Sequence, residues 1–218
     1  LLLMTIDHAN KYLLHGSVPA MFVVGRLSLP LFAFVLAYNL ARPGALADAA
    51  RVYPRTLARL AGAAAVATVP FTALGGLAAG WWPLNILATF AVSVAAMYLL
   101  LRGGAWRKTC AVMLVVMGGG LVEYWWPAIG MCLAAWYYCR RPSWAALTLW
   151  AVATLALNLN GWAFGRMPVV NASMWALAAF PLIFAAPRLK MRLPRMQWLF
   201  YAYFPVHLAV LWLLQHGR

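Results

Sequence analysis

The sequence is poor in negative charge, with three acidic side chains among 218 residues: Asp7, Asp48 and Glu123. Charged residues of both signs make up 9% of the chain and hydrophobic residues 66%, whereas a soluble domain carries about 25% charged and about half apolar residues. A water-soluble fold of this composition would lack the charge to cover its surface. Since a lipid bilayer removes this conflict, the mean hydropathy of +0.81 predicts an integral membrane protein.

Motifs that would indicate a familiar chemistry are also missing. Cys110, Cys132 and Cys139 form no CxxC pair, so neither a zinc site nor a disulfide framework is expected, and no metal is predicted. P-loop, GxGxxG, HExxH and GxSxG patterns do not occur. The glycine run at 118–120 precedes no phosphate-binding helix start, and we interpret it as a helix exit.

Long apolar runs are abundant, and a membrane-spanning helix needs about 20 such residues. Nine segments approach this length, at residues 1–15, 17–41, 57–77, 83–101, 109–122, 127–139, 144–159, 169–186 and 197–215. The fifth to seventh are short, which favours tilted or partly re-entrant helices. The first lacks the basic start of a signal peptide and reads as a helix whose first turns are missing. We predict one all-α domain over residues 1–218, a polytopic transmembrane bundle of about nine spans.

Basic residues indicate the orientation of this bundle, because most of the 17 Lys and Arg residues fall in four loops. They are Arg42, Arg51, Arg55 and Arg59; Arg102, Arg107 and Lys108; Arg140 and Arg141; and Arg188, Lys190, Arg192 and Arg195. These loops alternate with poorly charged ones near 78–82, 123–126 and 160–168, as the positive-inside rule requires. The pattern predicts a cytoplasmic N-terminus and an outer C-terminus, and it explains the net charge of +14 without nucleic acid.

Aromatic residues gather at the predicted outer boundary, at Trp81-Trp82, at 124–126 and at Trp162. Tyr and Trp favour the membrane interface because each ring has an apolar body and a polar edge. We interpret them as anchors among the membrane lipids rather than as a substrate platform.

Ionisable residues inside apolar segments are costly to bury, so each is a functional hypothesis. Asp7 and His8 lie in the first segment, where a carboxylate beside an imidazole can orient it and raise its basicity. The alternative is that Asp7 pairs with Lys11 while His8 packs in the core. Arg26, halfway along the second segment, stays charged and needs a partner, which is either Asp7 in a structural bridge or an anionic ligand.

The last segment holds a second intramembrane histidine, His207, four residues after Tyr203 and therefore on the same helix face. A lone histidine is usually a packed core residue. Because two intramembrane histidines occur here, we weigh a functional site equally with the core explanation. Asn39 and Asn85 add neutral polar groups near helix ends. We expect the first, second and last helices to converge, with His8, Arg26 and His207 around a cavity open to the cytosol.

Three arginines, Arg51, Arg55 and Arg59, repeat every fourth residue and form one basic face at the entry to the third segment. Topology alone explains such a face. The alternative is a cradle for a phosphorylated cofactor, because the guanidinium group matches phosphate geometry.

Motifs at both ends of the chain carry a resemblance to a known family. LMTIDHANKYL, then FVVGRLSLPLFAFVLAYNLAR, and finally FYAYFPVHLAVL resemble the TraX-type pilin acetylases of conjugative plasmids, of F-type or IncP-type transfer systems. By position, Asp7, His8, Arg26, Asn39, Asn85 and His207 match the motifs of that family. Arg59 matches less closely, since its spacing to Asn85 differs.

The resemblance implies a membrane-bound acyltransferase in the bacterial inner membrane, crossing it several times. Acetyl-CoA would be the co-substrate and the N-terminal amine of a membrane-held pilin subunit the acceptor. His8 would then act as general base, oriented by Asp7, while Arg51, Arg55 and Arg59 hold the phosphates of acetyl-CoA. Either Arg26 or Asn39 would stabilise the oxyanion.

Several alternatives remain open from the sequence. His207 could be the base in place of His8, and an acetyl-histidine intermediate could replace direct transfer. The acceptor could be another molecule, for example a sugar. A proton-coupled transporter or flippase would use Asp7, Arg26 and His207 as a relay, and a non-catalytic pilus-assembly protein would use them to lock helices together.

Overall fold

The computed structural model describes residues 1–75, 81–158, 174–188 and 198–217, and every regular element in these ranges is helical. The α-helices are α1 (Leu2–Tyr12), α2 (Pro19–Gly25), α3 (Ser28–Ala41), α4 (Pro43–Ala47), α5 (Ala49–Ala73), α6 (Ile86–Arg102), α7 (Ala105–Gly119), α8 (Trp125–Arg140), α9 (Trp144–Leu155), α11 (Ala179–Ala185) and α12 (Leu199–His216). Three 3-10 turns are η1 (Ala156–Asn158), η2 (Met174–Ala178) and η3 (Ala186–Arg188). The all-α prediction is therefore confirmed for the described residues.

Each of the nine predicted segments contains a helix, but fewer have the length of a span. In the described part of the chain three helices are long and apolar enough to cross a membrane. They are Pro19–Ala41, which joins α2 and α3, Ala49–Ala73 and Leu199–His216. The nine spans and the orientation of the N-terminus stay predictions, and the predicted loop at 160–168, Trp162, Lys190, Arg192 and Arg195 lie outside the described residues.

Local sequence explains several helix boundaries. Pro19 and Pro43 begin α2 and α4, where the missing N–H costs nothing. The Asn85 side chain caps α6 by accepting from the Leu87 N–H at 3.1 Å. Some boundaries were predicted wrongly. The third segment begins at Ala49 rather than at 57, so Arg51 and Arg55 lie on α5 and not in a loop. The fifth begins at Ala105 rather than at 109, so Arg107 and Lys108 lie on α7.

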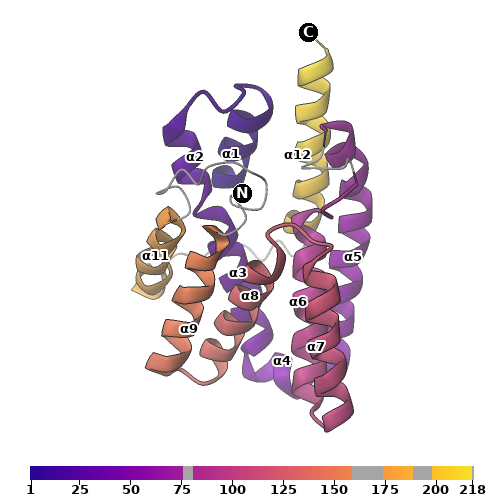
Figure 1. The fold of residues 1–218 in the computed structure, drawn as a ribbon, viewed down its shortest axis with the longest axis vertical. Helices are drawn as coiled ribbons and strands as arrows, with labels where there is room; N and C mark the ends of the chain where they lie inside the picture. Colours follow the sequence, from indigo (N-terminus) through magenta and orange to yellow (C-terminus); the bar gives the residue numbers. More distant parts are fainter. Residues whose placement is uncertain (76–80, 159–173, 189–197, 218) are drawn as a thin grey trace.

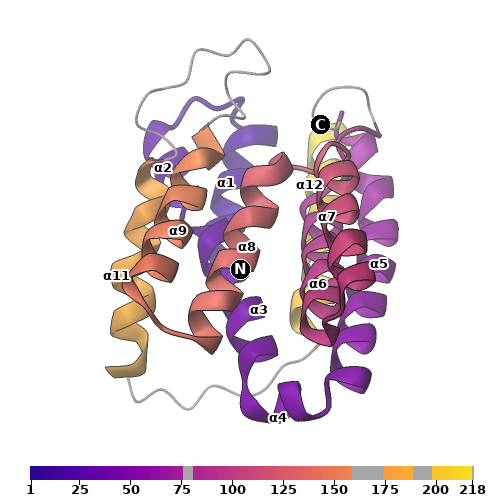
Figure 2. The ribbon, with the colours of Figure 1, turned by 60° about the horizontal axis from the view of Figure 1, so that its bottom comes forward.

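The helices form two groups joined at one end by α4 (Figure 1). One group contains α3, α8, α9 and α11, and the other contains α5, α6, α7 and α12 (Figure 2). The α6–α7 and α8–α9 connections lie at the same end as α4 (Figure 1). This end, here called the basic end, carries Arg42, Arg102, Arg107, Lys108, Arg140 and Arg141, which lie in or next to these connections.

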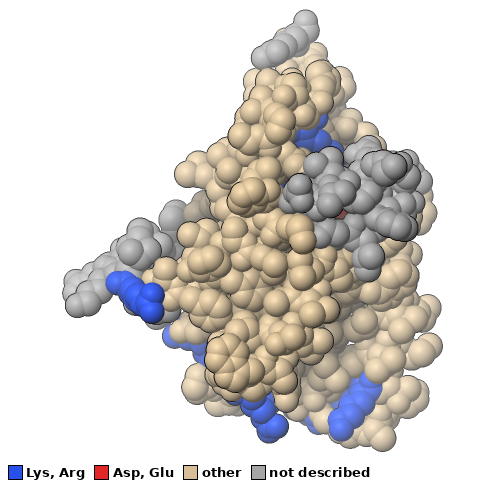
Figure 3. Space-filling view, turned by 60° about the vertical axis from the view of Figure 1, so that its left-hand side comes forward, with Lys and Arg blue, Asp and Glu red and all other residues tan. Residues whose placement is uncertain are grey.

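The surface between the ends of the bundle is nearly free of charge. Figure 3 shows Lys and Arg mainly around its lower part, with a broad uncharged area above them. Large apolar side chains such as Val69, Val116 and Leu149 are exposed there, at 71%, 53% and 56%. Such a surface is typical of a protein in contact with lipid.

Candidate functional site

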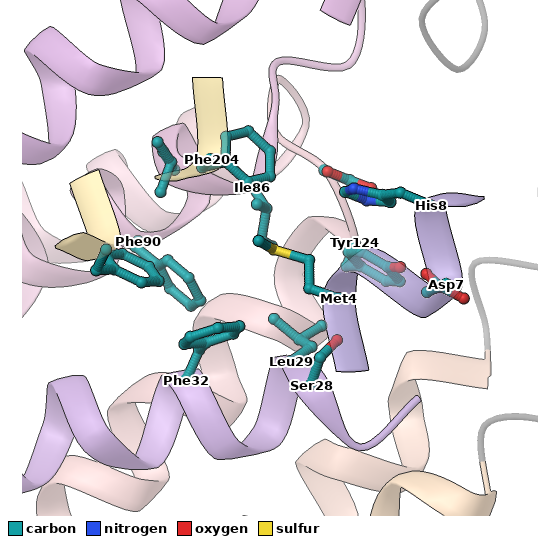
Figure 4. A pocket seen from close by; sticks show the side chains of 13 residues that line it. Met4, Asp7, His8, Ser28, Leu29, Phe32, Ile86, Phe90, Tyr124 and Phe204 are labelled. Atoms are coloured by element: carbon teal, nitrogen blue, oxygen red, sulfur yellow. The ribbon is translucent and has the colours of Figure 1, made fainter. Parts of the chain in front are cut away.

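A cavity of about 40 Å³ lies between the two helix groups. It is lined by Met4, Asp7, His8, Ser28, Leu29, Phe32, Ile86, Leu87, Phe90, Glu123, Tyr124, Phe200 and Phe204 (Figure 4). These residues come from α1, α3, the start of α6, the segment before α8, and α12. A buried water needs roughly 10–15 Å³ of such cavity volume. The cavity therefore has room for a few water-sized groups, and an acetyl group is about this large.

One wall of the cavity is built around an ion pair. Arg26, at the junction of α2 and α3, donates from Nη2 to both carboxylate oxygens of Asp7, at 3.0 and 3.2 Å. Its guanidinium carbon lies 4.2 Å from the centre of the Phe22 ring, and Nη1 donates to the Tyr124 hydroxyl at 3.4 Å. The predicted structural bridge is thus confirmed, and Asp7 has a different partner from the expected His8.

Close approach of α1 and α2 makes this pair possible. A Cβ atom at Gly25 would overlap the side chain of Asp7, so only glycine fits beside the carboxylate. The turn between the two helices is fixed by Asn10, whose side chain accepts from the Val18 N–H at 3.1 Å and donates to the Val18 carbonyl at 3.0 Å. The DHAN motif therefore supplies both a charged partner for Arg26 and the residue that closes the hairpin.

The two histidines meet at the residue of α1 that follows Asp7. His8 Nδ1 lies 2.6 Å from His207 Nε2, and the planes of the two stacked rings are nearly parallel, at 2°. His207 Nδ1 lies 3.0 Å from the backbone carbonyl of Tyr203, and the Tyr203 hydroxyl is hydrogen-bonded to Thr5. These contacts and the Asp7–Arg26 pair confirm that the first, second and last helices converge. Of the three residues predicted to surround one cavity, however, His8 lines it and Arg26 and His207 do not.

Sequence reasoning missed two residues of the site, Glu123 and Tyr124, which were assigned to an outer loop with aromatic anchors. Both line the cavity with Asp7 and His8. Burial raises the pKa of Glu123 to about 7, although Lys11 and Arg26 act in the opposite direction. Burial also raises the pKa of Tyr124 to about 12, so its hydroxyl stays protonated. The available signal was that Glu123 is one of three acids in an apolar chain.

The cavity has an apolar side and a polar side. Phe32 on α3, Phe90 on α6 and Phe200 on α12 each lie nearer to the basic end of their helix than the remaining lining residues of that helix. Figure 4 shows Phe32 and Phe90 across the cavity from Asp7, His8 and Tyr124. The titratable groups therefore lie on the side away from the basic end.

Asn39 and Asn85 are also absent from the cavity lining. Asn39 is exposed and donates to the Val35 carbonyl of its own helix at 2.8 Å. Asn85 is 1% exposed and donates to the Ala64 carbonyl at 2.9 Å in addition to capping α6. Both amides thus have structural partners, and Asn85 ties the start of α6 to α5.

The arginine face on α5 extends from the basic end towards the site. Arg51 and Arg55 are exposed. Arg59 is partly buried, with its guanidinium carbon 4.6 Å from the centre of the Trp198 ring. Trp198 precedes α12 by one residue, and Phe200 of the cavity follows two residues later. Arg59 therefore contacts the start of the helix that carries Phe200 of the cavity.

Comparison with known proteins identifies the family of the chain. A family model described as TraX protein matches residues 1–215. Protein TraX of Escherichia coli (strain K12) is 32% identical over 121 residues, which are 56% of this chain and 45% of that protein. The chain thus matches about half the length of this curated relative. No solved structure is similar enough to count as a match.

Proposed function

The chain belongs to the TraX family, which is related to conjugation, and we propose that it transfers an acetyl group from acetyl-CoA to the N-terminal amine of a pilin subunit. The site would work in the bacterial inner membrane, with the bundle crossing it several times. The observation that carries this proposal is the hydrogen-bonded histidine pair at the edge of a small cavity.

Hydrogen bonding assigns a role to each histidine. A carbonyl oxygen only accepts, so His207 Nδ1 must donate its proton to Tyr203. In neutral His207 the other nitrogen, Nε2, is then an acceptor, and His8 Nδ1–H donates to it. Neutral His8 consequently has its lone pair on Nε2. We propose His8 as the general base and His207 as the residue that fixes its tautomer.

Transfer then proceeds by direct attack. The acceptor nitrogen attacks the thioester carbonyl while His8 Nε2 takes a proton from it. The C–S bond breaks, and His8 returns this proton to the sulfur of CoA. Tyr124 is placed to stabilise the oxyanion, because it lines the cavity and accepts from Arg26, which leaves its own hydroxyl proton for another acceptor. Arg26 supports this group rather than lining the cavity itself.

The cavity is apolar on the side near the basic end and polar on the far side, and this arrangement supports entry of the thioester from the basic end. Arg51, Arg55 and Arg59 would bind the phosphates of acetyl-CoA, since cationic groups concentrate an anionic substrate. The thioester arm would pass Phe200, Phe32 and Phe90 and place the acetyl group beside His8. This agrees with the positive-inside prediction, which puts the basic end in the cytosol where acetyl-CoA is found.

Intact mass of the candidate pilin tests the proposal. Co-expression with the wild-type chain should add one acetyl group to the pilin, and co-expression with His8→Gln should not. His216→Gln is the matched control, because exposed His216 makes the same bond within α12 as His207 does, from Nδ1 to the Trp212 carbonyl at 3.0 Å. Acetylated pilin with His8→Gln would refute the base assignment. Unmodified pilin with the wild-type chain would favour the transporter or assembly roles.

A further inference from the structure

Glu123 is held in place by its backbone on both sides. Its N–H donates to the Leu84 carbonyl at 2.8 Å, and its carbonyl accepts from the Thr89 hydroxyl at 2.8 Å. One residue earlier, Val122 pairs with Leu84 in an isolated parallel bridge. The carboxylate is therefore presented to the cavity by a fixed segment between α7 and α8.

The backbone that follows Glu123 is strained. Tyr124 and Trp125 both adopt left-handed conformations, with φ of 60° and 51°. Such conformations are rare for residues other than glycine and are unfavourable, so they persist where the surroundings impose them and often mark functional sites. This turn directs Glu123 and Tyr124, two successive residues, into the same cavity.

The two carboxylates of the cavity differ in their partners. Asp7 is engaged by Arg26 through two hydrogen bonds. The backbone N–H of Ile86, at the N-terminus of α6, favours the ionised form of Glu123, as a helix N-terminus favours negative charge. The charges of Lys11 and Arg26 also stabilise its ionised form, while Asp7 opposes it. Burial outweighs these effects and raises the pKa to about 7, so Glu123 is a partly buried carboxyl group that can gain or lose a proton near neutral pH, in the same cavity as the proposed base.

From this arrangement, and resting on the transfer function above, we propose that Glu123 binds the ammonium group of the acceptor and takes its first proton. An α-amine is protonated near neutral pH, with a pKa of about 8, and it cannot attack in that form. The ammonium N–H bond breaks and the proton passes to the Glu123 carboxylate. The free amine attacks the thioester, its second proton goes to His8, and His8 returns it to the CoA sulfur. Protonated Glu123 releases its proton to water.

This assignment gives the cavity two proton acceptors for the two protons that an ammonium group must lose. A hydroxyl acceptor has one proton to lose and carries no charge, so it would need His8 alone. The pKa of Glu123, raised by burial to about 7, is close to that of the α-amine and supports exchange between them. The site therefore favours an amine over a sugar hydroxyl as the acceptor.

The competing explanation is structural, in which Glu123 offsets the charge of Lys11 near the end of α1. The two explanations differ in what Glu123→Gln changes. Loss of an ammonium site weakens binding of a charged acceptor and leaves a neutral acceptor unaffected. Loss of a structural charge weakens binding of the charged and the neutral acceptor equally. Removal of the Lys11 charge in the same variant should then restore binding of both acceptors.

Binding of two peptides to the purified full-length chain in lipid nanodiscs, in the presence of CoA, is the test. The peptides share one pilin N-terminal sequence and differ in a terminal amine against a terminal hydroxyl. At pH 7.5, where Glu123 with a pKa of about 7 is mostly ionised and an α-amine is still mostly protonated, the wild type should bind the amine at least 10-fold more tightly, because a charge-assisted hydrogen bond is among the stronger polar contacts. In Glu123→Gln the dissociation constants of the two peptides should agree within about twofold. The double variant Lys11→Met/Glu123→Gln should show the same loss of preference.

Each outcome decides between the explanations. A wild type without preference for the amine, a Glu123→Gln variant that keeps it, or a double variant that regains it would overturn the assignment. The double variant replaces the single one if the single variant does not fold, as judged by thermal melting. A wild-type chain that binds the amine selectively but transfers no acetyl group would refute the proposed function and leave the ammonium site standing.

Discussion

The assignment of His8 as base and His207 as its positioning partner makes a quantitative prediction. His207→Gln retains an amide oxygen that can accept from His8 Nδ1–H, whereas His207→Phe keeps the ring volume and removes the acceptor. The bond in question is short, at 2.6 Å, and His207 is 7% exposed, so water has little access to replace it. Without an acceptor, His8 is free to adopt the tautomer in which Nε2 carries the proton and is no longer basic.

General-base catalysis contributes roughly 100- to 10,000-fold to a rate. We therefore expect His8→Gln to lower kcat at least 100-fold, His207→Phe to lower it by about the same factor, and His207→Gln to lower it less than 10-fold. The KM for acetyl-CoA should stay within about threefold in all three variants, because neither histidine is placed to hold the nucleotide.

Release of free thiol from acetyl-CoA by the purified chain, with an acceptor peptide present, measures these values. Exposed His216→Gln serves as the control and should match the wild type. A His207→Gln variant as inactive as His207→Phe, together with a His8→Gln variant that keeps most of its activity, would reverse the two roles. Equal losses of folded protein in all histidine variants would show that the pair is only structural.

Three further predictions concern the charges around the cavity. Asp7→Asn should lower the free energy of unfolding by about 3 kcal/mol because it leaves the Arg26 charge unpaired, and Asp7→Asn/Arg26→Met should recover most of this loss. Thermal melting in detergent measures both variants, and an Asp7→Asn variant as stable as the wild type would contradict the prediction. Arg59→Ala should raise the KM for acetyl-CoA about 10-fold and leave a short acetyl thioester without phosphates unaffected, while Arg107→Ala changes neither. Burial raises the pKa of Glu123 to about 7, so its stabilising contribution is complete below its ordinary pKa of 4.5 and is lost as pH rises through 7. Glu123→Gln should therefore match the wild type near pH 5 and exceed its stability at pH 8, by roughly 3 kcal/mol at most; equal melting curves at pH 8 would contradict this.

Much of the fold follows from hydrophobicity, since each predicted apolar segment contains a helix. The lengths of these helices do not follow, because mean hydropathy places a segment in an apolar environment without saying how far it extends. The start of α5 shows the difference. Arg51 and Arg55 read as loop residues by charge, yet arginine is a good helix former and the helix continues through them to Ala49.

The candidate site was predictable where a costly residue stands alone in an apolar run. Asp7, His8, Arg26 and His207 were found in this way, and the structure brings them together. Glu123 was missed because a charge next to Tyr124-Trp125-Trp126 reads as a membrane boundary. Its place in the cavity depends on a bridge to Leu84 and on two left-handed residues, and neither feature follows from local sequence.

The contacts of the site also differ in the sequence distance that they span, and this has a consequence for synthesis of the protein. Asp7 and Arg26 are 19 residues apart, so they can pair as soon as the first hairpin leaves the ribosome. His8 and His207 are 199 residues apart, which at 5–20 residues per second is roughly 10 to 40 seconds of translation. The charges that are expensive in lipid are neutralised at the outset, and the reactive histidine acquires its partner only when the last helix arrives.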